Sequence, residues 1–128
     1  MVALLLVSVG FALIQAVWHA DYITRGTMSA WTKRRWALAW SVAIGIPALI
    51  AWPWWAAVAA FFSLRGLFSL TFRHSLSELV YWPPGYIGVT AHYDRLLRFV
   101  FGASAARAAT WIEVALFALG LALWVALK

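Results

Sequence analysis

The sequence predicts an all-helical integral membrane protein: a bundle of four transmembrane helices with a short interfacial helix before the last one. Hydrophobic residues make up 66% of the 128 residues and charged residues only 11%, and the mean hydropathy is +0.86. A soluble domain of this size could not enclose so much apolar surface, because a small globule needs a polar exterior. The apolar runs are continuous, which favours helices over the alternating strands of a membrane barrel. We therefore expect residues 1–128 to form a single transmembrane domain.

Four apolar stretches have the length of a membrane-crossing helix. They are Val2–Trp18, Trp36–Trp52, Trp54–Phe72 and Ala108–Leu127. Each is close to the roughly 17–25 residues that a helix needs to cross about 30 Å of hydrocarbon. The first stretch lacks the basic start and the small-residue cleavage site of a secretion signal, so we expect a retained helix. The turn at Pro53 is so tight that the second and third spans should form a helical hairpin.

The basic side chains predict the orientation of these spans. Almost all of them lie in two segments that join spans, residues 20–35 and 73–107. With four spans both segments fall on one side, which the positive-inside rule makes cytoplasmic, and both termini are then external. Tryptophans gather at the predicted span ends, as in an aromatic belt. These features predict a multi-pass protein of the bacterial inner membrane. The net charge of +6 then indicates contact with anionic lipid headgroups and no nucleic-acid partner.

Two charged residues fall inside the predicted spans. Arg65 lies about 12 Å and Glu113 about 9 Å into the bilayer, and Gln15 and Ser41 have a similar depth. Each span thus offers one polar group to a common intramembrane layer. A lone charge in hydrocarbon costs at least about 2.5–3.5 kcal/mol. We therefore expect Arg65 and Glu113 to form an ion pair, which either has a structural role or belongs to a path for ions or protons.

A second polar cluster is expected at the cytoplasmic ends of the spans. It consists of three histidines and three carboxylates: His19, Asp21, His74, Glu78, His92 and Asp94. Imidazole and carboxylate groups suit zinc, manganese or iron, so a divalent transition metal is the cofactor that this cluster would hold. The spacing matches no metal motif, so we expect a set of interfacial hydrogen bonds without any cofactor, and the metal site is the alternative. Residues i and i+2 point about 200° apart on a helix, so the two His-x-Asp pairs converge only on extended or turning backbone.

The segment between the third and fourth spans has the most distinctive sequence. Tyr81-Trp82-Pro83-Pro84-Gly85 contains a turn signal among aromatic residues. Leu96–Phe101 predicts a short interfacial helix that ends at Gly102. The stretch 65–98, with Tyr86-x-Gly88-x-Thr90 followed by Asp94-Arg95, resembles a segment of small uncharacterised bacterial membrane proteins. The resemblance implies four helices and brings no activity with it.

Three functions fit these features. The first, which we expect, is a non-catalytic subunit, scaffold or oligomerising protein that binds a second copy, another membrane protein or anionic lipid. Its contact residues would be Lys33, Arg34, Arg35, Arg95 and Arg98, and its close helix packing would use Gly45, Ala103, Ser104 and Gly120. The second is a metal-dependent interfacial enzyme that uses the histidine and carboxylate cluster on a lipid-type substrate. The third is a small oligomeric channel or transporter lined by Arg65 and Glu113.

Overall fold

The computed structural model describes residues 1–26, 35, 39, 42, 46, 50, 53–87 and 92–127. In this part of the chain the regular elements are all helical: α1 (Val2–Arg25), α3 (Trp54–Leu79), α4 (His92–Phe101), the 3₁₀ turn η1 (Gly102–Ser104) and α5 (Ala105–Ala126). Three of the described helical runs, namely α1, α3 and the run from α4 through α5, are long and apolar enough to cross a membrane. For the described residues the all-helical prediction is confirmed, and these three runs have the length and composition of membrane spans. The predicted second span, Trp36–Trp52, lies outside the described residues except for isolated positions.

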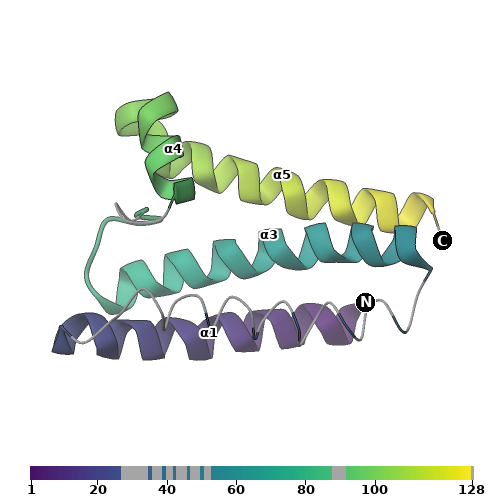
Figure 1. Cartoon of the computed structure of the whole chain (residues 1–128), viewed down its shortest axis with the longest axis horizontal. Helices are drawn as coiled ribbons and strands as arrows, with labels where there is room; N and C mark the ends of the chain where they lie inside the picture. Colours follow the sequence, from purple (N-terminus) through teal and green to yellow (C-terminus); the bar gives the residue numbers. More distant parts are fainter. Residues whose placement is uncertain are drawn as a thin grey trace.

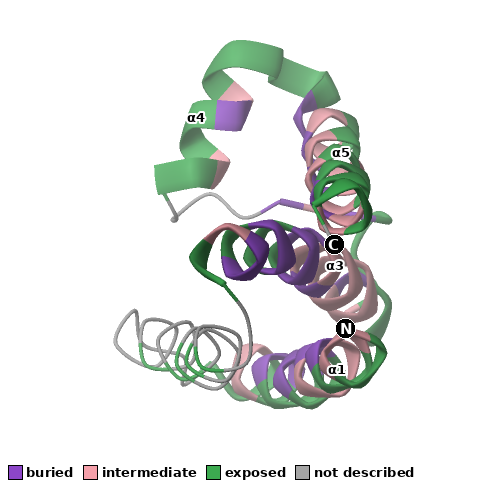
Figure 2. Ribbon diagram, turned by 90° about the vertical axis from the view of Figure 1, so that its right-hand side faces the viewer, coloured by how far each residue is buried: buried purple, intermediate pink, exposed green. Residues whose placement is uncertain are grey.

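Helix α3 lies between α1 and α5 (Figures 1 and 2). Helices α1 and α3 run in the same direction, since Ser8 contacts Leu64 near their beginnings and His19 contacts Phe72 further along. Helix α5 runs the opposite way. The start of α1, the start of α3 and the end of α5 thus share one end of the bundle, called the terminal end, and the opposite end is the loop end. Because α1 and α3 are parallel, the chain between them has to return from the loop end to the terminal end.

The described helices extend beyond the predicted spans. Helix α1 continues past Trp18 to Arg25 and α3 past Phe72 to Leu79. Helix α1 stops at Gly26, whose left-handed backbone (φ +68°) lets its amide bond to carbonyls of the last turn. The prediction ended the third span at Phe72, directly before the charged Arg73. A helix need not end there when the charge finds a partner inside the protein.

Helices α3 and α5 are in backbone contact through glycine. A Cβ atom on Gly66 would lie 2.6 Å from the carbonyl oxygen of Glu113 and 2.7 Å from the amide nitrogen of Phe117. A Cβ atom on Gly120 would lie 2.5 Å from the amide nitrogen of Ser63. The hydroxyl of Ser63 donates a hydrogen bond to the carbonyl of Phe117 at 3.3 Å. Small residues permit this approach, which is typical of helix pairs in membranes, where dispersion contacts drive association.

Not all of the small residues predicted at helix contacts are found at one. Gly120 is confirmed at the interface between α3 and α5. Ala103 and Ser104 are exposed within η1, so their prediction as helix-contact residues is wrong. Gly45 lies outside the described residues. Gly66, which the sequence did not single out, makes a similarly close approach because it stands on the face of α3 that meets α5.

Two apolar clusters complete the described packing. The first joins α1 to α3 and consists of Ala12, Ala60, Leu64 and Phe68. The second lies at the loop end, where the loop after α3, helix α4 and the start of α5 meet, and consists of Ile87, Leu97, Ala105 and Ala109. The second cluster places α4 against the beginning of α5 (Figure 2).

We predict that Gly66→Ala destabilises the protein by about 1–3 kcal/mol, because the added methyl group forces apart two helices whose backbones touch. Gly10→Ala is the matched control in α1, since nothing lies within 4 Å of a Cβ atom there. It should be neutral or stabilising, because alanine is the better helix former. Steric trapping in bicelles measures both free energies of unfolding. Equal stability of Gly66→Ala and the unsubstituted protein would contradict the close contact.

Candidate functional site

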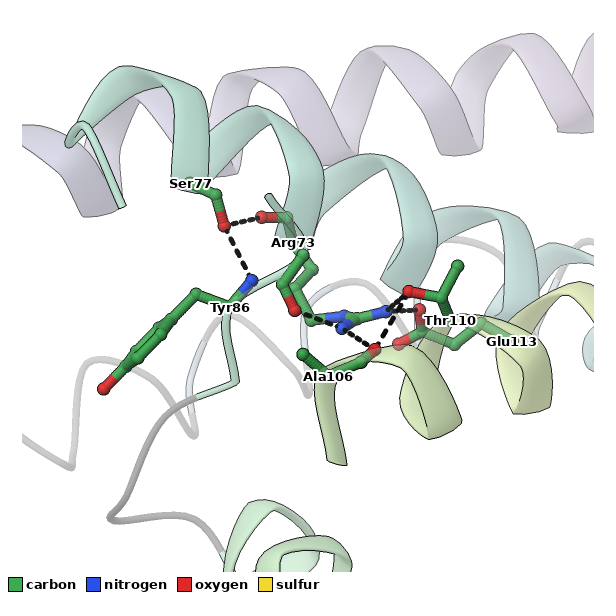
Figure 3. A network of polar contacts seen from close by, with 7 residues as sticks. Arg73, Ser77, Tyr86, Ala106, Thr110 and Glu113 are labelled. Atoms are coloured by element: carbon green, nitrogen blue, oxygen red, sulfur yellow. Dashed lines mark hydrogen bonds and ion pairs between the residues drawn. The ribbon is translucent and has the colours of Figure 1, made fainter. Parts of the chain in front are cut away.

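A buried arginine joins three segments at the loop end (Figure 3). Arg73, near the end of α3, donates from Nη2 to Glu113 Oε2 at 2.6 Å and to Thr110 Oγ1 at 2.9 Å, both on α5. Its Nη1 donates to the carbonyl of Ala106 at 3.2 Å and to the carbonyl of Gly85 in the loop after α3. The side chains of Arg73 and Glu113 are only 11% and 6% exposed. These contacts, called the Arg73 network, form a buried ion pair that also fixes the loop.

Ser77 ties the same loop to the end of α3. Its hydroxyl donates to the carbonyl of Arg73 at 2.8 Å and accepts the amide N–H of Tyr86 at 3.1 Å (Figure 3). Its own carbonyl accepts the amide N–H of Trp82 at 2.8 Å. The rings of Trp82 and Tyr86 pack with their centroids 4.6 Å apart. The loop is therefore held by backbone and side-chain bonds at both of its ends.

Gly85 allows the loop to close onto α3. Its φ of +66° is in the left-handed region that favours glycine. A Cβ atom there would lie 3.2 Å from Cε1 and Nε2 of His74 and 3.4 Å from Arg73 Nη1. A side chain at this position would press on the His74 ring and on Arg73 Nη1, one of the donors of the Arg73 network.

A second arginine attaches α4 to the loop. Arg98 donates from Nη2 to the carbonyl of Ile87 at 2.7 Å, and its guanidinium carbon lies 5.4 Å from the centre of the Tyr86 ring. Leu97 is buried beside Ile87 in the loop-end cluster. The loop 80–87 thus has Arg73 on one side and Arg98 on the other.

The structure gives Glu113 a partner other than the expected Arg65. The charges of Arg65 and Glu113 interact electrostatically, but the hydrogen-bonded ion pair of Glu113 is with Arg73. Helical side chains lean toward the N-terminus of their own helix. Because α3 and α5 are antiparallel, Arg73 leans toward the terminal end and Glu113 toward the loop end, so they meet. Arg65 is exposed, with its guanidinium carbon 5.9 Å from the centre of the Phe68 ring.

The remaining members of the predicted intramembrane layer are placed as follows. Gln15 is buried in α1, where its backbone carbonyl accepts a hydrogen bond from His19 Nδ1 at 2.8 Å. Glu113 is buried in α5, within the Arg73 network. Ser41 lies outside the described residues. Gln15 and Glu113 thus lie in different helices on either side of α3.

The predicted metal ligands do not converge, although all of them are described: His19, Asp21, His74, Glu78, His92 and Asp94. Over residues 1–26, 53–87 and 92–127, no group of three or more His, Cys, Asp or Glu side chains is placed to hold a metal ion. The reason is helical geometry. Both His-x-Asp pairs lie within helices, α1 and α4, so the two side chains of each pair point about 200° apart.

Several of these side chains have structural contacts instead. The His19 ring packs edge-on against Phe72, with centroids 5.1 Å apart. Asp21 forms an i,i+4 ion pair with Arg25, 2.9 Å from Asp21 Oδ1 to Arg25 Nε. Arg95 Nη2 donates to His92 Nδ1 at 3.0 Å. His74 contacts the loop at Gly85, as described above.

The predicted headgroup contacts separate into two kinds. Arg95 is exposed on α4, as predicted for a residue that meets lipid or a partner, whereas Arg98 is partly buried and holds the loop. Arg35 is exposed, and Lys33 and Arg34 lie outside the described residues. The structure adds Arg107, which is exposed in the first turn of α5. The sequence had assigned this residue only to the basic segment that sets the orientation.

We predict that Arg73→Leu destabilises the protein by about 3–5 kcal/mol, because it leaves Glu113 buried without its ion-pair partner. The double variant Arg73→Leu/Glu113→Leu should recover much of this loss, which a double-mutant cycle would quantify. Arg107→Leu, the matched exposed control, should change stability by no more than about 0.5 kcal/mol. A larger loss for Arg65→Leu than for Arg73→Leu would make Arg65 the principal partner of Glu113 and contradict this assignment.

No protein-family model, no curated protein and no solved structure matches this chain. The resemblance to small bacterial membrane proteins therefore stays a prediction, and the Arg73 network and its surroundings are the best indication of function.

Proposed function

We propose that the chain is a small multi-pass protein of the bacterial inner membrane that acts as a non-catalytic subunit or scaffold. Its loop end would be a preformed surface that binds another membrane protein or a second copy of the chain. The observation that carries this proposal is the Arg73 network. Each of the hydrogen bonds from its two Nη atoms goes to a group of the protein itself, so the buried charge joins helices and a loop.

The direction of the helices supports four crossings of the membrane. Because α1 and α3 are parallel, the chain between them has to cover the length of the bundle again, and the apolar stretch Trp36–Trp52 is long enough for a span. The chain would then begin and end on the same side of the membrane.

The distribution of charge supports a cytoplasmic loop end. The described residues 2–14, 53–64 and 114–127, which form the terminal half of the bundle, contain no Asp, Glu, Lys or Arg. The exposed arginines Arg25, Arg95 and Arg107 lie at the loop end or next to it. An excess of basic residues on one side is the usual mark of the cytoplasmic face. Trp54, at the terminal end, and Trp82, at the loop end, suit the two aromatic belts.

The loop after α3 has the character of a recognition surface. Tyr81 is 96% exposed and has a left-handed backbone (φ +56°), and Pro83 and Pro84 are exposed beside it. Exposed aromatic residues are enriched in protein interfaces. The bonds of Ser77 and Arg73 hold the loop in one conformation, so little conformational entropy would be lost when a partner binds.

The setting of the buried charges favours a scaffold over a channel. In the channel hypothesis Arg65 and Glu113 line a pore, but Glu113 is buried between α3 and α5 and hydrogen-bonded to Arg73. The setting of the histidines likewise gives the enzyme hypothesis no metal centre within the described residues. Among the described residues, no observation specifically favours the channel or the enzyme.

Native mass spectrometry of the protein, extracted in polymer nanodiscs from its own membrane, tests this proposal. We expect a complex of defined stoichiometry with another membrane protein or with further copies of the chain. Tyr81→Ala should weaken the complex at least about tenfold, because exposed aromatic residues dominate such interfaces. Phe62→Ala, which removes an exposed ring from the middle of α3, is the matched control and should leave the complex intact. A monomer that carries a stoichiometric transition metal, lost in His74→Ala, would contradict the proposal and favour an enzyme.

A further inference from the structure

Helix α4 exposes an apolar stripe and has two of its charged residues partly buried on the side that faces the protein. The residues that face the protein include Asp94 and Arg98, both partly buried, together with the buried Leu97. The outward stripe contains Leu96, Phe99 and Val100, which are 59%, 89% and 58% exposed. In water such a helix would bury the apolar stripe and expose the charges. The exposed stripe therefore indicates an apolar environment around α4.

Positive charge lies next to this stripe. Arg95 is one turn from Phe99 on the same outward side, where it donates a hydrogen bond to His92. Arg107 is exposed on the first turn of α5, the part of that helix against which α4 packs. An apolar helical stripe bordered by arginine is the pattern of helices that lie in the surface of anionic bilayers.

We infer that the outward face of α4 lies in the lipid leaflet at the loop end, with Arg95 and Arg107 contacting the headgroups of anionic phospholipids. Two features favour lipid over a protein as the occupant. The first is the positive charge of Arg95 and Arg107, which is complementary to anionic headgroups. The second is that α4 leads through η1 directly into α5, and the run His92–Ala126 is apolar enough to cross a membrane. The stripe on α4 would therefore lie at the surface of the same bilayer that α5 crosses.

The two arginines on α4 would then have different roles. Arg98 points to the protein and holds the carbonyl of Ile87, so it fixes the helix on the loop. Arg95 points outward and supplies charge for the headgroups. This inference rests on the membrane placement proposed above, and it adds the chemical class of the lipid.

The absence of cysteine from the sequence permits a direct test with single labels. A fluorophore on Phe99→Cys is placed in vesicles that contain brominated phosphatidylglycerol or brominated phosphatidylcholine at the same mole fraction. Both lipids should quench the label, and the anionic lipid should be enriched beside it about fivefold for each contacting arginine. Arg95→Gln with Arg107→Gln should remove this preference. Arg25→Gln, an exposed arginine on α1 at the same end of the bundle, is the matched control and should preserve it.

A label on Leu119→Cys, exposed in the terminal half of α5, separates the two proposals. If neither lipid quenches it, the membrane placement fails and the proposed function fails with it. If lipid quenches the label at position 119 but not at position 99, α4 faces water or a protein and the inference about α4 is overturned. Equal quenching at position 99 by both lipids overturns the preference for anionic headgroups.

Discussion

The burial of a charged guanidinium is the constraint on which the loop end depends. A side chain of Arg73 that is 11% exposed must find partners within the protein, because an unpaired buried charge is strongly unfavourable. Its partners come from the loop at Gly85 and from α5 at Ala106, Thr110 and Glu113. The bonds of its two Nη atoms therefore set the position of the loop relative to α3 and α5, and α3 need not end at Arg73.

This arrangement depends on how closely the two helices approach. Gly66 and Gly120 bring the backbones of α3 and α5 into contact, and Glu113 lies directly opposite Gly66. A larger residue at position 66 would move Glu113 away from Arg73, so the small-residue contact and the ion pair support each other. Helix packing and loop position are thereby linked, although the residues responsible lie about two turns apart on α3.

Hydropathy alone predicted the all-helical membrane class and the membrane-crossing helices among the described residues, because continuous apolar runs leave the backbone no other way to satisfy its polar groups in lipid. The ion pair of Asp21 with Arg25 depends only on their spacing within a single helix. The partner of Glu113 was not predictable from the depth of each residue in the membrane. It depends on the direction in which side chains point on two antiparallel helices. The role of Gly66 was not predictable for a related reason. It depends on the residue of α5 that lies opposite Gly66, and the sequence does not show which residues of two helices face each other.

The central claim is that Arg73 holds the loop 80–87 against the helices, and hydrogen–deuterium exchange on Arg73→Lys in lipid nanodiscs tests it directly. Lysine keeps the positive charge but cannot reproduce the forked set of bonds to Gly85, Ala106, Thr110 and Glu113. We expect the amides of Trp82 and Tyr86 to exchange faster in the variant while the amides of α1 are unchanged. Unchanged exchange at Trp82 and Tyr86 would mean that Ser77 and the backbone bonds hold the loop without Arg73, and would contradict the claim.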